Sequence, residues 1–463
     1  MPLHIFDNRW RAFSLLIPLF SVLLYWVLRI HPNTQETMPE AAVPAPSGQA
    51  EHVAAIMLSW HSLELVALKK IQSLWAGYGH ICEVTARATS VGAARRMREM
   101  YGDIGDASEE DGRDTYALIL KLISPPPGAQ DEGHLRKIMS YEVEQNFYGS
   151  VAPLLGRDLP MARCIATTQG KPGSDAGEGV VATLMTDLRL EYPVAGEKRT
   201  VLNETQVYAA LNWLSEFHRR SWAIRPPLPI QELLLPPLEE AERRRRGDAS
   251  GRLVWLNGGY TYLATRRREY ASLIADSASE WSSALCEPLA SSGRSTAEMV
   301  ASFLTPRGRD HESLIHGDVK SENLFTTQSG SRVAFYDFQY VGLGLGVCDL
   351  AKLFTCSVPL HMLTEDDGRA ELSMGEGERR LLERYRSNLL DGIDKRYNWD
   401  TFIRHWETAL VDWLRFQASW GFWGNTEWLE ARVRSILKDQ NWRAWLHEQQ
   451  SLIDQEIGSP PRN

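Results

Sequence analysis

Hydrophobic and polar positions divide the chain into an earlier part that favours strands and a later part that favours helices. Residues 71–90 predict two strands joined by a glycine-containing turn, and the apolar run of residues 115–123 is typical of a buried strand. In residues 132–155 the apolar side chains recur at helical spacing instead. Another helix is expected after Asn203, because Asn203 and Gln206 have the spacing of a capping box. The pattern indicates an α+β fold.

These signals predict two lobes of different composition. We place a small strand-rich lobe at residues 51–188, with a charged and partly helical insertion at residues 91–114. A larger, mainly helical lobe is expected at residues 189–455, followed by a disordered tail at residues 456–463. Within the helical lobe, residues 314–354 interrupt the helical pattern with short apolar strands and a polar loop. That interruption is where the candidate chemistry lies.

The beginning of the chain has a different character from both lobes. Residues 12–28 form an uncharged, largely apolar run with arginines on either side, and its length is at the short end of what crosses a bilayer as a helix. We therefore predict a membrane anchor at residues 1–30, with a buried amphipathic helix as the alternative. Residues 31–50 are rich in proline, alanine and polar residues, which predicts a disordered spacer.

Composition excludes several classes of protein. The length of 463 residues predicts two or three domain-sized units. A net charge of -9 argues against a nucleic-acid-binding protein, which usually carries a basic domain. The five cysteines are scattered without a CxxC or Cys/His spacing, so neither a disulfide framework nor a zinc site is expected.

The segment SLIHGDVKSENLF, residues 313–325, places several polar groups between two apolar runs. Asp318 and Asn323 lie in its loop, and the strand expected at residues 333–336 leads directly to Asp337. Phosphoryl transfer from ATP needs hard oxygen ligands for magnesium and a carboxylate that accepts the proton of the attacking hydroxyl. The spacing predicts Asp318 as the base, and Asn323 and Asp337 as the magnesium ligands.

The other half of such a site is expected upstream. Lys121 interrupts a buried apolar run and needs a polar partner, because an unpaired buried charge is very costly. ATP phosphates would provide that partner, with Glu144 on the following helix holding the amine and Glu142 as the competing candidate. Gly77 and Gly79 lie in a turn where the backbone could approach phosphates, although two glycines alone are a weak signal.

The segments HGDVKSEN, YDFQ, GVCDLAKLF and SYEVEQNFY together resemble the aminoglycoside phosphotransferase and choline kinase superfamily. They look most like its choline-kinase-like and ecdysteroid-kinase-like branch. The resemblance covers roughly residues 71–390 and implies a protein-kinase-like fold. It also implies that His316 holds the catalytic loop, that Asp349 supports that loop, and that Met185 and Asp187 belong to the hinge that meets adenine.

The same segments depart from the protein kinases. A protein kinase would have arginine in place of Gly317, glycine in place of Gln339, and a later Ala-Pro-Glu element. The sequence therefore predicts a small-molecule kinase that uses ATP and Mg²⁺ to phosphorylate a hydroxyl group. The alternatives are a membrane-tethered pseudokinase that binds ATP without turnover and, with less support, a protein kinase.

Candidate acceptor residues lie in DWLRFQASWGFWGN near the end of the helical lobe. Asp412 stands among Trp420, Trp423 and other aromatic residues, an arrangement that could form a cage for a quaternary ammonium group. Packing between helices is the alternative role for these rings. Arg415 could instead contact an acidic substrate.

The sequence leaves the acceptor, the oligomeric state and the location open. Choline, ethanolamine, a sugar, a steroid alcohol and an aminoglycoside-like compound remain candidates. Arginines before the apolar run favour a cytoplasmic N-terminus, which would put the kinase lobes on the far side of the membrane. Unpaired cysteines and the need for ATP favour the cytosol. The membrane is expected as a partner, and nucleic acid is not.

Overall fold

The structure is a computed structural model in which the described residues from 50 to 458 form one compact unit. The predicted anchor and nearly all of the predicted spacer lie outside the described residues. Within the described part, no helix is long and apolar enough to cross a membrane. The described residues are 47–102, 105–106, 113–126, 131–169, 180–224, 227–248, 253–290, 292–365 and 368–458.

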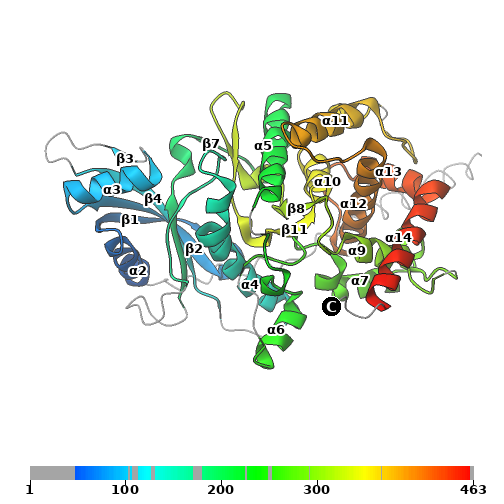
Figure 1. The fold of residues 1–463 in the computed structure, drawn as a ribbon, viewed down its shortest axis with the longest axis horizontal. Coiled ribbons are helices and arrows are strands. Elements are labelled where there is room, and N and C mark those ends of the chain that lie inside the picture. Colours follow the sequence, from blue (N-terminus) through cyan, green and yellow to red (C-terminus); the bar gives the residue numbers. More distant parts are fainter. Residues whose placement is uncertain are drawn as a thin grey trace, which may run out of the picture. The chain divides into compact units, whose positions relative to one another are not determined.

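An antiparallel sheet forms the first lobe, as the alternating pattern predicted (Figure 1). Its strands follow the order β1-β2-β4-β6-β5, and β3 pairs with β4 outside this path. Along β2 the burial alternates residue by residue, as expected for a strand with one face on a core. The strands are β1 (Leu63–Ser73), β2 (Gly79–Ala88), β3 (Gly105–Asp106), β4 (Thr115–Ile123), β5 (Cys164–Thr167) and β6 (Val181–Thr186).

Helices cover this sheet. Two of them, α2 (Ser47–Ser59) and α3 (Val91–Tyr101), share a hydrophobic core with the strands through small residues such as Ala54 and Ala94. Helix α4 (Glu132–Asn146) contacts β6 and brings Glu144 towards the sheet. The helix predicted over residues 132–155 is not continuous, because it becomes a π turn at Phe147–Val151 and a 3₁₀ turn at Ala152–Leu155. Pro153 lacks the amide hydrogen that a longer α-helix would use.

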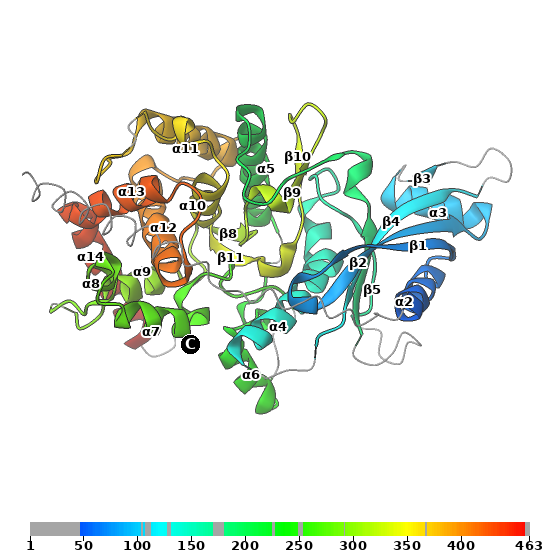
Figure 2. The same cartoon turned by 180° about the vertical axis from the view of Figure 1, so that it is seen from behind.

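The second lobe is mainly helical, as predicted (Figure 2). Helix α5 begins with the predicted capping box, in which Asn203 and Gln206 exchange side-chain to backbone hydrogen bonds of 3.0 Å. The α-helices are α5 (Glu204–Trp222), α6 (Pro237–Arg245), α7 (Arg267–Ala275), α8 (Glu280–Cys286), α9 (Thr296–Leu304), α10 (Val347–Cys356), α11 (Glu376–Leu390), α12 (Trp399–Trp420), α13 (Thr426–Lys438) and α14 (Gln440–Gly458).

Small antiparallel strands lie between α9 and α10, where the helical pattern was interrupted. Strand β8 (Glu312–Ile315) pairs with β11 (Gly342–Leu345), and β9 (Leu324–Thr326) pairs with β10 (Val333–Phe335) and β7 (Val194–Ala195). Phe338, which follows β10, stacks on Phe147 after α4 with ring centroids 4.2 Å apart. This buried aromatic contact joins the polar loops of the second lobe to the first lobe.

Buried His405 on α12 gives the fold a testable dependence on pH. Burial, with further repulsion from His311 and Arg309, lowers the pKa of His405 to about 3. Its Nδ1 lies 2.5 Å from the hydroxyl of Tyr397. Because the unfolded chain binds this proton near pH 6.5, stability should fall as the pH drops below that value. The loss by pH 5 should be about 2 kcal/mol from this group alone.

Urea unfolding at pH 7.5 and pH 5 of the wild type and of His405→Gln would measure this contribution. We expect the free energy of unfolding to change less with pH in the variant, because the variant lacks the titrating ring. Equal pH dependence in the two proteins would show that His405 does not titrate differently in the folded and unfolded states.

Candidate functional site

Within the predicted catalytic region, residues 314–354, the loop of residues 316–323 connects strands β8 and β9. The Nδ2 of Asn323 donates to the backbone oxygen of Asp318 at 2.8 Å and to its Oδ2 at 2.9 Å. Strand β10 runs beside β9 and leads through Tyr336 to Asp337, which has a left-handed backbone with φ 64° and ψ 57°. This conformation is unusual for a residue other than glycine, and it turns the carboxylate of Asp337 back towards the loop. The three predicted residues therefore come together.

Two buried groups hold the catalytic loop from behind. Asp349 at the start of α10 accepts hydrogen bonds from the backbone amides of His316 at 2.7 Å and Gly317 at 2.9 Å. His316 in turn bonds the backbone oxygen of Tyr336 through Nε2 at 2.9 Å, and its Nδ1 accepts from the amide of Asp318 at 3.3 Å. Burial lowers the pKa of His316, which keeps its ring neutral for this pair of bonds.

The charge of Asp349 is maintained inside the protein by hydrogen bonds. Burial alone would raise the pKa of this carboxyl, but the hydrogen bond and charge of His218, 3.2 Å away, leave it below its ordinary value. The other ring nitrogen of His218 lies 2.7 Å from the hydroxyl of Tyr385 on α11. The loop is thus tied to the helices beneath it.

Lys121 on β4 connects the two lobes. Its Nζ lies 2.5 Å from Oε2 of Glu144 on α4 and 3.0 Å from Oδ1 of Asp337. Burial opposes a charged amine, but Asp337 and Glu144 together raise the pKa of Lys121 above its ordinary value. Glu142, the competing partner, points elsewhere and pairs with Arg244 on α6 at 2.7 Å. The predicted choice of Glu144 agrees with this geometry.

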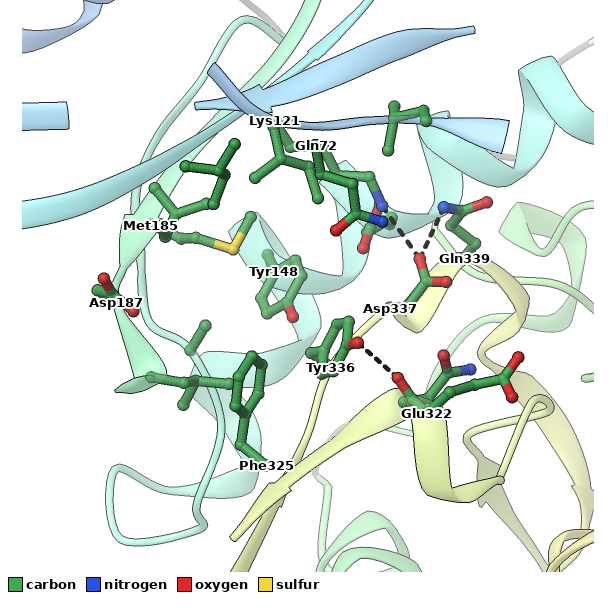
Figure 3. A pocket seen from close by; sticks show the side chains of 18 of the residues that line it. Gln72, Lys121, Tyr148, Met185, Asp187, Glu322, Phe325, Tyr336, Asp337 and Gln339 are labelled. Atoms are coloured by element: carbon green, nitrogen blue, oxygen red, sulfur yellow. Dashed lines mark hydrogen bonds and ion pairs between the residues drawn. The ribbon is translucent and has the colours of Figure 1, made fainter. Parts of the chain in front are cut away.

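Gln339 is a functional candidate that the sequence reasoning used only as a contrast with protein kinases. Its Nε2 donates to Oδ1 of Asp337 at 2.7 Å, and its Oε1 accepts from Ser140 on α4 at 3.2 Å (Figure 3). The same Oδ1 accepts from Lys121. Both donors therefore use one oxygen of Asp337 and leave Oδ2 to face the pocket. The spacing Asp-x-Gln after a buried strand was the available signal.

A pocket of about 530 Å³ lies between the lobes and contains most of these groups. Apolar side chains surround one end, where Met185, Tyr148 and Phe325 face the open space, and charged groups surround the other end (Figure 3). Such a pocket suits a ligand with a flat apolar ring and a polyanionic tail. The lining includes Gln72, Ile81, Ile119, Lys121, Lys137, Glu144, Ala162, Met185, Asp187, Leu188, Lys320, Asn323, Phe325, Asp337 and Tyr340.

The predicted hinge residues line this pocket, although Asp187 has a structural partner. Its carboxylate accepts from the backbone amide of Arg189 at 2.9 Å and pairs with the Arg189 guanidinium. The guanidinium of Arg189 also forms an ion pair with Glu83 on β2 at 2.6 Å. Asp187 therefore shapes the turn after β6, while Met185 supplies an apolar wall.

The predicted glycines, Gly77 and Gly79, lie at the turn between β1 and β2. In the described part of the hairpin it is Gln72, Leu74 and Ile81 that line the pocket, and the glycines lie at the turn. Gly77 has φ +73°, and a Cβ on Gly79 would lie 2.1 Å from the backbone oxygen of Leu122. The glycines are required for a tight turn and for close packing of β2 on β4, rather than by contact with the pocket.

The donor set suits a magnesium ion. With Nδ2 of Asn323 committed to Asp318, its Oδ1 remains as an oxygen ligand beside Oδ2 of Asp337. Two carboxylates, Glu144 and Asp337, share the ammonium of Lys121. In the described residues no cluster of three or more His, Cys, Asp or Glu side chains could hold a metal. Few protein ligands are typical of Mg²⁺, which keeps waters and substrate phosphates.

The predicted acceptor residues do not form an open acidic cage. Arg415 is fully buried and binds Oδ1 of Asp412 at 2.8 Å, so the carboxylate is already paired. Trp423 packs edge-on against Trp413 at 5.5 Å, while Trp420 is 42% exposed. Trp423 and the Asp412–Arg415 ion pair therefore contribute to packing between helices, which was the alternative role in the sequence analysis.

Comparison with protein families gives a match that spans the site. Residues 118–386 match the family model APH, described as the phosphotransferase enzyme family. This match covers more than half of the chain and includes every residue from Lys121 to Asp349 discussed above.

The chain belongs to this phosphotransferase family. The predicted superfamily and the predicted enzyme class, a small-molecule kinase, are thereby confirmed. No curated protein matches the sequence.

Several solved structures of phosphotransferases are similar in outline to this family member. A choline kinase from Cryptosporidium parvum is 11% identical, with 95% of this chain and 98% of that chain covered and a TM-score of 0.37. A macrolide 2'-phosphotransferase from Brachybacterium faecium is 11% identical, with 90% and 100% covered and a TM-score of 0.35. An ethanolamine kinase from Plasmodium vivax is 11% identical, with 86% and 83% covered and a TM-score of 0.35. The assignment to the family rests on the family match alone.

Support of the catalytic loop by Asp349 can be tested through stability. Asp349→Asn removes a charged acceptor and places an amide donor against backbone donors. The free energy of unfolding should fall by about 3 kcal/mol. Urea unfolding at pH 7 would measure it, with Asp391→Asn at an exposed position as the control. Equal stability of the two variants would contradict the assigned role.

Proposed function

We propose that the protein transfers the γ-phosphate of ATP to a hydroxyl group of a small molecule, with Asp318 as the catalytic base. The observation that carries this proposal is that Asn323 and Asp337 line the pocket together, while Asn323 holds Asp318 and Asp337 pairs with Lys121. Family membership supports the reaction class. The role of each residue and the identity of the donor are part of the proposal.

Asp318 has the surroundings that a base in this reaction needs. Its Oδ2 accepts from Asn323 and lies 3.2 Å from Nζ of Lys320, so one carboxylate oxygen is fixed by two donors. The other oxygen is then oriented to accept the proton of the acceptor hydroxyl as that oxygen attacks. Lys320 also lies 3.1 Å from Glu322, which positions its ammonium beside the pocket.

Asn323 and Asp337 would hold magnesium through one oxygen each, and Gln339 would fix the orientation of Asp337. When bound, the metal neutralises the charge that develops on the transferred phosphoryl group. Lys121 would bind the phosphates nearer the ribose, held by Glu144. Met185 and the apolar residues around it would accept the adenine ring.

The alternative remains an ATP-binding protein of the same fold without turnover. Its distinguishing property is that nucleotide binding persists while no acceptor is phosphorylated. The four polar residues expected for catalysis are all present, which favours the enzyme. The membrane anchor and the placement of the kinase lobes relative to a membrane stay predictions from the sequence.

Asp318→Asn should abolish transfer and leave nucleotide binding in place, because the amide cannot accept the proton while the shape of the site is kept. Full-length protein with Mg²⁺ and γ-labelled ATP would be incubated with a metabolite extract and a panel of choline, sugars and sterols. A fall in label transfer of at least about 10³-fold is expected for the variant. Transfer that persists in Asp318→Asn would remove Asp318 as the base, and a wild type that binds ATP but labels nothing would favour the alternative.

Two neighbouring glutamates on α4 provide a matched test of the Lys121 ion pair. Glu144→Gln weakens the charge that holds Lys121, and we expect kcat/KM for ATP to fall by about 10- to 100-fold. Glu142→Gln should stay close to the wild type, because Glu142 pairs with Arg244 outside the pocket. Steady-state kinetics would measure kcat/KM for ATP in both variants. An equal fall of kcat/KM in the two variants would contradict a specific role for Glu144.

A further inference from the structure

An aromatic wall continues from the proposed ATP pocket past the catalytic loop. Tyr340 lines the pocket and packs on Tyr260 with ring centroids 4.9 Å apart. Tyr260 meets Phe416 of α12 edge-on at 5.6 Å, and Phe416 stacks on Trp420 at 6.2 Å. These four residues, Tyr260, Tyr340, Phe416 and Trp420, are called the aromatic wall below.

The aromatic wall lies against the catalytic loop. The amide of Gly259 donates to the backbone oxygen of Tyr340 at 2.8 Å, and a Cβ on Gly317 would lie 2.6 Å from that amide nitrogen. Lys352 donates to the backbone oxygen of Gly317 and lies 5.3 Å from the ring of Tyr260. The wall therefore begins directly beside Asp318.

A cation from the chain itself already covers the wall. The guanidinium carbon of Arg266 lies 5.4 Å from the ring centroid of Tyr260, 5.3 Å from Phe416 and 5.0 Å from Trp420. Nε of Arg266 donates to the backbone oxygen of Tyr260 at 2.7 Å, and Nη1 pairs with Glu269 at 2.9 Å. Because Arg266 is only 4% exposed, it is a fixed part of the site.

A quaternary ammonium acceptor would need the ring faces of Tyr260 and Trp420 that Arg266 covers, since Phe416 is fully buried. Cation–π attraction requires the cation within about 6 Å of a ring centroid, and two cations cannot share one face without repulsion. The nearby carboxylates offer no compensation, since Asp412 is paired with Arg415 and Glu269 with Arg266. Lys320 in turn forms ion pairs with Asp318 and Glu322. The carboxylates around the wall are thus already paired, and Lys352 adds a second cation beside Tyr260.

We infer that the acceptor is an uncharged alcohol whose apolar body packs beside the aromatic wall, and that Arg266 excludes cationic amino alcohols from it. This inference rests on the proposed function, because it concerns the acceptor of the same reaction. It replaces the ammonium cage considered from the sequence, in which Trp420 was a member and Arg266 had no role. Arg266 acts here as a specificity-determining residue.

The test uses two alcohols that differ only in charge, namely choline and its neutral carbon isostere 3,3-dimethylbutan-1-ol. Binding to full-length protein would be followed by tryptophan fluorescence, to which Trp420 contributes, and by calorimetry. We expect the wild type to bind the neutral alcohol at least about tenfold more tightly than choline. Arg266→Met opens the ring faces, so choline should bind about tenfold more tightly to it than to the wild type.

Two further variants separate the charge of Arg266 from its packing. Arg266→Lys keeps a cation at the wall and should retain the preference for the neutral alcohol. Arg267→Met removes the neighbouring arginine, which is 52% exposed and pairs with Glu239, and should leave both affinities unchanged. Thermal unfolding of each variant would show that the fold is retained.

The proposal is overturned if choline binds the wild type as tightly as its isostere, if neither alcohol binds, or if Arg266→Met gains no affinity for choline. Failure of the proposed function has a different signature. In that case no alcohol accepts label from γ-labelled ATP, while the preference in binding for the neutral alcohol is still measured.

Discussion

The ammonium of Lys121 is the interaction on which the arrangement of the two lobes depends. It is 7% exposed, it comes from the sheet of the first lobe, and its partners come from helix α4 and from the end of β10. A buried charge is costly unless carboxylates surround it, so the three elements must approach one another for the fold to be stable. The stacking of Phe338 on Phe147 at 4.2 Å brings the same elements together by apolar contact. Electrostatics and packing therefore favour one geometry.

That geometry also determines the chemistry of Asp337. Lys121 and Gln339 both donate to Oδ1, and Ser140 on α4 donates to the side-chain oxygen of Gln339. A movement of α4 would change the distance to Glu144 and the orientation of Gln339 at once. The position of one helix thus controls both the phosphate-binding lysine and the proposed metal ligand, which is how a structural constraint becomes a requirement for catalysis.

The sequence predicted the lobes and most of the site because the relevant signals are local. Lysine within an apolar strand, and an aspartate directly after one, each have few physical explanations, and the family motif joined them. The aromatic wall could not be predicted in the same way. Arg266 and Trp420 are more than 150 positions apart in the chain, and their contact depends on how α7 packs on α12. The break after Asn146 was missed because the helical periodicity continues through Pro153.

The charged groups are arranged differently at the two ends of the site. This difference explains why the nucleotide end could be predicted from the sequence and the acceptor end could not. At the proposed nucleotide end, charged groups of both signs line an open pocket, among them Lys121, Lys320 and Asp337. At the proposed acceptor end the carboxylates Asp412 and Glu269 are already paired within the protein, with Arg415 and Arg266. A surface with matched charges gains little from a charged ligand, because binding would have to break existing pairs. Affinity at that end must come from apolar contact with the rings, which permits variation in acceptor size while discriminating against positive charge.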